Sequence, residues 1–228
     1  MSELFEIPQN FKGTAWADDE KYQQMYRQSL ENPEAFWAEQ AERVDWFKKW
    51  DKVLDWNYHE ANIRWFEGGQ LNVSYNCLDR HLEKKGDQIA LIWEGDDPEE
   101  DRSFTYRELH EQVCRFANVL KQQGIEKGDR VMIYMPMVPE LAMACLACAR
   151  IGAIHSVVFG GFSAEALKSR IQDCGGKMMI TADAGLRGKK SVPLKVNADA
   201  AMEGTSIETC LVLKRTGDPI EIKEGRDV

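Results

Sequence analysis

The sequence predicts an α/β fold, a doubly wound and mostly parallel sheet, preceded by a Trp-rich helical N-terminal extension. From residue 129 onward, short apolar runs alternate with helical patterns, which indicates right-handed crossovers and a parallel sheet covered on both faces. Before residue 67, charged residues separate large aromatic residues at roughly helical intervals, and all but one of the seven tryptophans lie there. We therefore divide the chain into an extension over 1–66 and an α/β domain over 67–228.

Length and charge exclude several classes of protein. A chain of 228 residues with an apolar fraction of 43% can bury a substantial core. The formal net charge of −9 argues against nonspecific binding to nucleic acid or to an anionic membrane, although a local basic cluster could still hold a phosphate. No apolar run reaches the ~20 residues that span a bilayer, and the acidic N-terminus does not resemble a signal peptide. We expect a cytoplasmic protein.

The extension carries its aromatics on otherwise polar helices. One helix is predicted to begin at Pro33, with Ser29 or Asn32 available as a cap. Large aromatics in this setting usually anchor a segment on a larger body. An aromatic ligand box is the alternative, but no set of polar groups converges with these rings.

Between residues 76 and 123 the pattern predicts a helix, a hairpin and a second helix. Residues 76–85 form the first helix, and strands over 89–93 and up to Phe104 form an antiparallel hairpin around the acidic turn 95–100. That turn could bind a metal, but a solvated loop is the more common role of a charge run. Thr105 and Glu108 form a capping box that opens the second helix, which runs to Gln123 and ends before Gly124.

The repetitive part then follows in order. Strands are predicted over 130–135, 153–159, 177–181 and 208–213, with helices over 139–150, 163–173 and 193–202 between them. In such sheets ligands collect beyond the carboxyl ends of the strands. The turns after the second and third of these strands are therefore candidate site segments.

The turn after the second strand contains Gly160 and Gly161. Glycine permits positive φ and close approach of other backbone or of a ligand. Ser163 can cap the helix that follows, and a junction of this kind is a ready anion site because free N–H groups and the helix dipole converge on it. A sharp turn without a ligand is the alternative interpretation.

The segment after the third strand is basic. Arg187, Lys189 and Lys190 lie within four residues, beside Gly188 and just before a predicted helix. Arginine offers a planar fork of donors and lysine a mobile point charge, which together suit a phosphate monoester. A basic loop that merely balances an acidic chain remains the alternative.

The remaining candidates for chemistry are cysteines and one histidine. The six cysteines are scattered through core-like segments, as expected of free thiols in a reducing compartment. Cys145 and Cys148 form a C-x-x-C, which raises the possibility of redox or metal chemistry, but the pair lies inside a run typical of a buried helix. His155 has no partner in sequence, and we expect a packed core histidine. No catalytic residue and no metal ligand is predicted.

Three stretches carry a specific resemblance to a known family. They are residues 65–79 (WFEGGQLNVSYNCLD), 134–140 (YMPMVPE) and 152–163 (GAIHSVVFGGFS), followed by the basic segment 187–190. With these stretches the chain resembles, almost from end to end, the N-terminal part of AMP-forming acetyl-CoA synthetases, members of the acyl-adenylate-forming superfamily.

The resemblance implies a two-step ligation and a partial binding site. Acetate and ATP would form acetyl-adenylate with release of pyrophosphate, and the CoA thiol would then displace AMP. Carried over by position, part of the CoA nucleotide site falls on this chain. The adenine would lie against Phe159, Gly160, Gly161 and Val192, and the 3′-phosphate would meet the segment containing Arg187, Gly188, Lys189 and Lys190. The family usually has glycine or alanine at the position of Lys189, so a third cation or crowding of the loop is expected there.

The resemblance also implies what these residues do not contain. The Ser/Thr/Gly-rich phosphate loop that ends in P-K-G, the acetate pocket, the hinge aspartate and the C-terminal lysine of the family are not among them. Residues 67–228 would thus be the first part of the large N-terminal domain, the sheet would be incomplete, and ATP and Mg²⁺ would bind outside this chain. We expect no adenylation by the chain alone, and possible self-association through the exposed sheet edge. A noncatalytic structural or binding module and a C-x-x-C redox protein are the competing classes.

Overall fold

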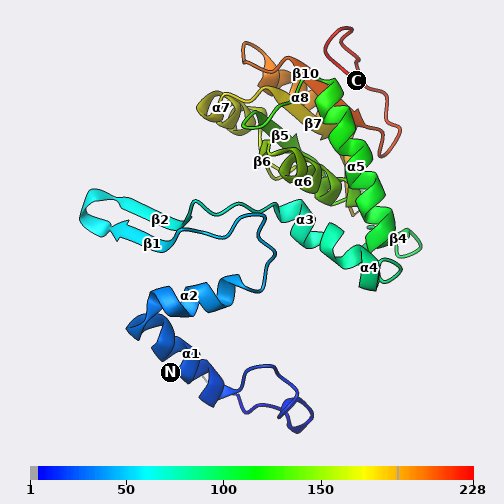
Figure 1. Ribbon diagram of the computed structural model, residues 1–228. Helices are drawn as coiled ribbons and strands as arrows, with labels where there is room; N and C mark the ends of the chain where they lie inside the picture. The colour runs from blue at the N-terminus through cyan, green and yellow to red at the C-terminus, as the bar shows by residue number, and fades with distance from the viewer. Residues whose placement is uncertain (1–4, 189) are drawn as a thin grey trace. The chain divides into compact units, whose positions relative to one another are not determined.

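The computed structural model describes residues 5–188 and 190–228 (Figure 1). Internal contacts divide the chain into two compact units, Met1–Leu71 and Asn72–Val228. Each unit is described by itself.

The first unit is helical in its first half and a hairpin in its second. Its elements are η1 (Gln9–Phe11), α1 (Asp19–Glu31), α2 (Pro33–Ala41), β1 (Lys52–Asn57), η2 (Tyr58–Glu60) and β2 (Asn62–Glu67). The predicted helix at Pro33 is confirmed, and Asn32 caps it by accepting the N–H of Ala35 at 3.4 Å. The helical prediction is wrong for the last part of the extension, residues 52–66, where β1 and β2 pair antiparallel with Leu54 opposite Trp65. The apolar residues of β1, Val53, Leu54 and Trp56, do not alternate strictly with polar ones, so the local pattern gave no clear period of two.

Several aromatic rings of this unit pack on one another. The Trp46 ring lies 5.0 Å from that of Trp50 and 5.4 Å from that of Phe66, and its indole N–H donates to the Ala41 carbonyl at 2.9 Å. Other rings remain in solvent, with Trp56 60% exposed and Trp16 63% exposed. The Trp-rich cluster therefore holds α2 and the hairpin together, and its role as an anchor on a larger body stays a prediction.

The second unit is built on a parallel sheet. Its order is β10-β7-β5-β6, and every neighbouring pair is parallel. The elements are α3 (Val73–Cys77), η3 (Asp79–His81), α4 (Leu82–Lys85), β3 (Ile89–Glu94), β4 (Asp101–Thr105), α5 (Tyr106–Gln122), β5 (Arg130–Tyr134), α6 (Pro139–Ile151), β6 (Ile154–Val157), α7 (Ala164–Cys174), β7 (Met178–Ala182), β8 (Gly185–Arg187), β9 (Lys190–Val192), α8 (Leu194–Met202) and β10 (Thr209–Leu213).

Helices cover both faces of this sheet, so the doubly wound prediction is confirmed. Side chains of β5 alternate between two buried clusters: Val131 and Ile133 pack with residues of α5 and α6, whereas Met132 and Tyr134 pack with residues of α7 and α8. Figure 1 shows α5 and α6 on the near side of the strands. The connection after β5, through α6, covers one face of the sheet, whereas the connections after β6 and β7, through α7 and α8, cover the other. The connections therefore diverge at β5, and a ligand crevice is expected there.

The two edges of the sheet differ. The last residues of the chain lie beside β10: Cys210 donates its N–H to the Arg226 carbonyl at 2.8 Å, and Val228 donates to the Cys210 carbonyl at 2.9 Å. On the other edge, no strand among the described residues pairs with the outer side of β6. Ile154 and Val157 of β6 are 54% and 49% exposed. Self-association through this edge stays a prediction.

Two local predictions before the sheet had different outcomes. The hairpin of β3 and β4 and the capping box of Thr105 and Glu108 are confirmed. The single helix over 76–85 is wrong, because Leu78, at φ −123° and ψ −66°, interrupts it and buries its side chain, leaving α3, η3 and α4 as separate short pieces. Among the described residues, no helix is long and apolar enough to cross a membrane.

Candidate functional site

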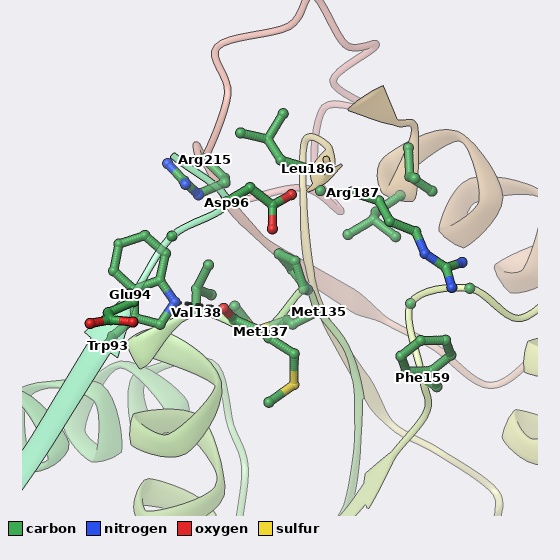
Figure 2. A pocket seen from close by; sticks show the side chains of 17 residues that line it. Trp93, Glu94, Asp96, Met135, Met137, Val138, Phe159, Leu186, Arg187 and Arg215 are labelled. Carbon is green, nitrogen blue, oxygen red and sulfur yellow. Dashed lines mark hydrogen bonds between the residues drawn. The ribbon is translucent and has the colours of Figure 1, made fainter. Parts of the chain in front are cut away.

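A cavity of about 280 Å³ lies at the carboxyl edge of the parallel sheet (Figure 2). The segments after all four parallel strands contribute to it: residues 135–138 after β5, 159–161 after β6, 185–187 after β7 and Arg215 after β10. The end of β3 and the start of its loop, residues 93–96, line the cavity as well. This is the edge at which open parallel sheets bind ligands.

The loop with the paired glycines is held against the sheet by Tyr134. The buried Tyr134 hydroxyl lies 2.8 Å from the Phe162 carbonyl oxygen and 3.1 Å from that of Gly160. A Cβ on Gly160 would lie 3.3 Å from the Met135 carbonyl oxygen, a tight contact, so glycine suits this close approach. Ser163 caps α7 as predicted, accepting the N–H of Ala166 at 3.3 Å.

The basic segment folds into a hairpin that was not predicted. In β8 and β9 Arg187 pairs directly with Lys190, and Gly188 follows Arg187 at φ +61°. Residues directly opposite in an antiparallel pair point to the same face, so two cations stand side by side. Over residues 5–188 and 190–228, no carboxylate lies within ion-pair distance of either one. This like-charge pair would be relieved by a bound anion.

Aromatic and aliphatic side chains form the walls beside this cation pair. The Phe159 ring is 58% exposed, and the ring of Phe162 packs against it edge-on with centroids 6.2 Å apart. Figure 2 shows the Arg187 side chain reaching toward the segment that carries Phe159. Val192 and Leu194 complete this side of the cavity. An exposed ring face beside a free guanidinium suits a planar heterocycle that carries a phosphate.

The opposite wall is built from the β3–β4 hairpin. The Trp93 indole N–H donates to the Met137 carbonyl at 2.7 Å, and the Arg215 guanidinium lies over the Trp93 ring, 5.2 Å from its centroid. Two nitrogens of Arg215 bind the two carboxylate oxygens of Glu100 at 2.6 Å each. This fork lowers the pKa of Glu100 and raises that of Arg215. Arg215 is thus an internally neutralised cation, unlike Arg187.

A buried carboxylate organises the segment after β10. Asp183, 3% exposed, accepts the backbone N–H groups of Ala184, Arg215, Thr216 and Gly217, the shortest at 2.7 Å. Burial alone would raise the pKa of Asp183, but the four N–H donors outweigh it and the pKa is lowered. Asp183 therefore stays charged and fixes the backbone from which Arg215 projects.

The structure brings most of the predicted site residues together. Phe159, Gly160, Gly161, Arg187 and Val192 all line the cavity. Gly188 and Lys190 lie in the adjacent turn and strand of the β8–β9 hairpin, and Lys189 lies outside the described residues.

Sequence reasoning missed the opposite wall. Trp93, Asp96 and Arg215 line the same cavity, although the acidic turn was interpreted as a solvated loop. A tryptophan next to Glu94-Gly95-Asp96 at the end of a strand was the available signal, because binding pockets are lined mainly by apolar and aromatic side chains with a few polar groups.

The cysteine and histidine predictions had opposite outcomes. Cys148 is fully buried in α6, and burial raises its pKa to about 12. Burial raises the pKa of Cys145 as well, which is the reverse of what a redox pair needs. The packed-core prediction for His155 is wrong, because its side chain lies exposed on the edge strand β6.

Comparison with known proteins accounts for nearly the whole chain. The family model described as "AMP-binding enzyme" matches residues 78–227, and the model described as "Acetyl-coenzyme A synthetase N-terminus" matches residues 22–77. The chain belongs to the AMP-binding enzyme family.

Individual relatives of this AMP-binding enzyme family member are long proteins. The chain is 58% identical to an acetyl-coenzyme A synthetase of Syntrophus aciditrophicus, over 98% of this chain and 35% of that protein. It is 57% identical to acetyl-coenzyme A synthetase 2 of Pseudomonas putida, over 92% of this chain and 33% of that protein. The chain thus spans about a third of the length of these curated relatives and corresponds to their N-terminal portion.

A solved structure supports the fold alone. The acetoacetyl-CoA synthetase of Streptomyces lividans aligns with a TM-score of 0.81 at 24% identity, over 96% of this chain and 33% of that one. The α/β architecture described above is therefore that of a known acyl-CoA synthetase.

Proposed function

We propose that the chain supplies part of the CoA nucleotide site of an acetate–CoA ligase of the AMP-forming type. The whole enzyme would make acetyl-CoA from acetate, ATP and CoA through acetyl-adenylate, while ATP and Mg²⁺ would bind outside these residues. The observation that carries the proposal is the convergence of the exposed Phe159 ring and the Arg187 guanidinium on one cavity edge, with Lys190 directly opposite Arg187 in the hairpin. Among the described residues, neither cation forms an ion pair. The high identity to acetyl-coenzyme A synthetases over nearly the whole chain supports it.

The proposed site recognises the nucleotide by stacking and by charge. The adenine ring would lie on Phe159, with the tight Gly160–Gly161 turn allowing close approach and Val192 closing the apolar side. The 3′-phosphate would take charge-assisted hydrogen bonds from Arg187 and Lys190, which removes the like-charge repulsion between them. These residues bind and orient CoA, and no described residue is assigned a role in forming or breaking bonds.

A titration tests the proposal. Isothermal titration calorimetry of the chain with CoA, dephospho-CoA and adenosine 3′,5′-bisphosphate should give the weakest binding for dephospho-CoA. One charge-assisted contact worth about 1.5 kcal/mol corresponds to roughly tenfold in affinity. Adenosine 3′,5′-bisphosphate lacks the pantetheine arm but carries the 3′-phosphate, so it too should bind more tightly than dephospho-CoA.

Variants locate the source of that preference. Arg187→Ala should weaken CoA binding and leave dephospho-CoA binding nearly unchanged, and Arg187→Ala with Lys190→Ala should abolish the distinction. Arg115→Ala is the matched control, since Arg115 is an exposed arginine of α5 outside the cavity. Equal affinity of the wild-type chain for CoA and dephospho-CoA would reject the site and favour a noncatalytic module with an unoccupied basic loop.

The proposal also concerns activity. We propose that the chain alone does not adenylate acetate, because the residues that would hold ATP are not part of it. Acetate-dependent exchange of pyrophosphate into ATP by the purified chain would contradict this statement. Such a result would leave the proposed CoA site unaffected.

A further inference from the structure

The loop between β3 and β4 closes on itself through its own hydrogen bonds. Gly95 donates its N–H to the Glu100 carbonyl at 2.7 Å, Glu100 donates to the Asp97 carbonyl at 2.9 Å, and the Asp97 side chain accepts the Glu99 N–H at 3.0 Å. Asp96 takes no part in these bonds. Its side chain is therefore available to a neighbouring element.

That neighbour is the basic hairpin of β8 and β9. The Asp96 carboxylate accepts the backbone N–H of Gly188 at 2.7 Å. Gly188 begins the turn between Arg187 and Lys190, and its φ of +61° is a conformation that other residues adopt only under strain. A hydrogen bond to a charged acceptor is stronger than one between neutral groups. The bond thus fastens the hairpin at the first residue of the turn between Arg187 and Lys190.

The loop that carries Asp96 is itself braced. Glu100, four residues further on, binds Arg215 through a two-bond fork, and the backbone of residue 215 is held by the buried carboxylate of Asp183. Gly95 fits because a Cβ there would lie 2.9 Å from the Glu100 carboxylate. Asp96 therefore projects from a rigid support, and a rigid support can set the orientation of what it holds.

The charge of Asp96 and its hydrogen bond have opposite consequences for an anionic ligand. A carboxylate near Arg187 and Lys190 lowers the positive potential that attracts a phosphate, although solvent screens this effect at an exposed site. Its hydrogen bond fixes the hairpin, which reduces the ordering that a ligand would otherwise have to impose. Only the second consequence favours binding.

We propose that Asp96 is a positioning residue that determines specificity for the phosphorylated nucleotide, because its hydrogen bond to Gly188 holds Arg187 and Lys190 where they meet a phosphate monoester. This inference rests on the proposed CoA site. The role belongs to the hydrogen bond, so an uncharged acceptor of the same shape should replace the carboxylate.

Calorimetry on the full chain with CoA and dephospho-CoA tests the inference through the ratio of the two dissociation constants. We expect Asp96→Ala to reduce the roughly tenfold wild-type ratio to about twofold, through weaker CoA binding alone. Asp96→Asn, whose amide oxygen still accepts from Gly188, should keep the ratio and bind CoA as tightly or slightly more tightly. Glu99→Ala removes an exposed carboxylate of the same loop whose side chain makes no described contact, and it should leave the ratio unchanged.

A second measurement does not depend on any ligand. In NMR hydrogen exchange, the Gly188 amide should be protected in the wild type and in Asp96→Asn but exchange freely in Asp96→Ala. An Asp96→Ala chain that keeps the wild-type ratio, an Asp96→Asn chain that loses it, or an amide equally protected in all three would overturn the inference. A wild-type chain that does not distinguish the two ligands would instead reject the proposed CoA site, and the inference with it.

Discussion

Substitution of the buried Lys195 by methionine should destabilise the second unit strongly. The Lys195 side chain is 1% exposed, and its ammonium lies 2.8 Å from carboxylate oxygens of Asp199 and of Asp227 and 3.0 Å from the Glu221 carbonyl. Burial alone would lower the pKa of Lys195, but the two carboxylates outweigh it and raise the pKa. The lysine is therefore charged and fully partnered.

The size of the effect follows from what the substitution leaves behind. In Lys195→Met the apolar stem is kept, while the carboxylates of Asp199 and Asp227 keep Arg226 as their one cationic partner among the described residues. The Asp227 side chain is fully buried. Removing one partner of a buried charge cluster typically costs about 3–5 kcal/mol, and we expect about 3 kcal/mol here because Arg226 stays. The C-terminal segment that covers the edge of β10 should be the first part to loosen.

Urea unfolding followed by circular dichroism measures this change. The midpoint should fall while the slope stays constant, and Lys121→Met on the exposed face of α5 should shift stability by no more than about 0.5 kcal/mol. The double variant Lys195→Met with Asp199→Asn should be less unstable than the sum of its single changes, because it balances the charges again. A Lys195→Met chain as stable as the control would refute the reasoning.

Two further predictions concern titration and thiol reactivity. Burial alone would raise the pKa of Asp227, but hydrogen bonds from Arg226 and Lys195 lower it to about 2, below its ordinary value of 3.8. This shift stabilises the folded chain by about 2 kcal/mol above about pH 4, and the stabilisation is lost as the pH falls toward 2. Urea midpoints should therefore drop over this pH range, and they should drop less in Asp227→Asn. An equal fall of the urea midpoint with pH in both chains would contradict the prediction. Cys148 and Cys210 are buried, and burial raises the pKa of each thiol to about 12. A thiol reagent at neutral pH should therefore label the exposed Cys77 first, with Cys77→Ser as the reference. Labelling of Cys148 and Cys210 as fast as that of Cys77 would count against the prediction.

Most of the α/β unit could be predicted because its local signals agree with one another. The capping box at Thr105, the glycine that ends α6 and the apolar runs of β5 and β7 each predict boundaries within one residue of those in the structure. The hairpin of β1 and β2 could not, since neither strand alternates strictly: Val53 and Leu54 are adjacent in β1, and Trp65 and Phe66 are adjacent in β2. The packing of Trp46 and Trp50 on Phe66 joins separate segments, which local patterns do not predict.

The candidate site was only half visible in the sequence. Phe159, the paired glycines and Arg187 follow strand ends, so the rule of the carboxyl edge locates them. The wall of Trp93 and Asp96 comes from an antiparallel hairpin outside the parallel sheet, and no periodicity says where such a hairpin docks. Its contact with the basic hairpin joins residues 92 positions apart, a distance over which local patterns carry no information.

The carboxylate of Asp183 has a consequence for which anions this edge of the sheet can accept. It already occupies the backbone N–H groups of residues 215–217, so this stretch offers an incoming phosphate no cradle of main-chain donors. A phosphate that binds beside this stretch must therefore take its hydrogen bonds from other groups, such as the Arg187 guanidinium that also lines the cavity. Selection of an anion here depends on side chains, which substitution can change, rather than on the main chain of residues 215–217.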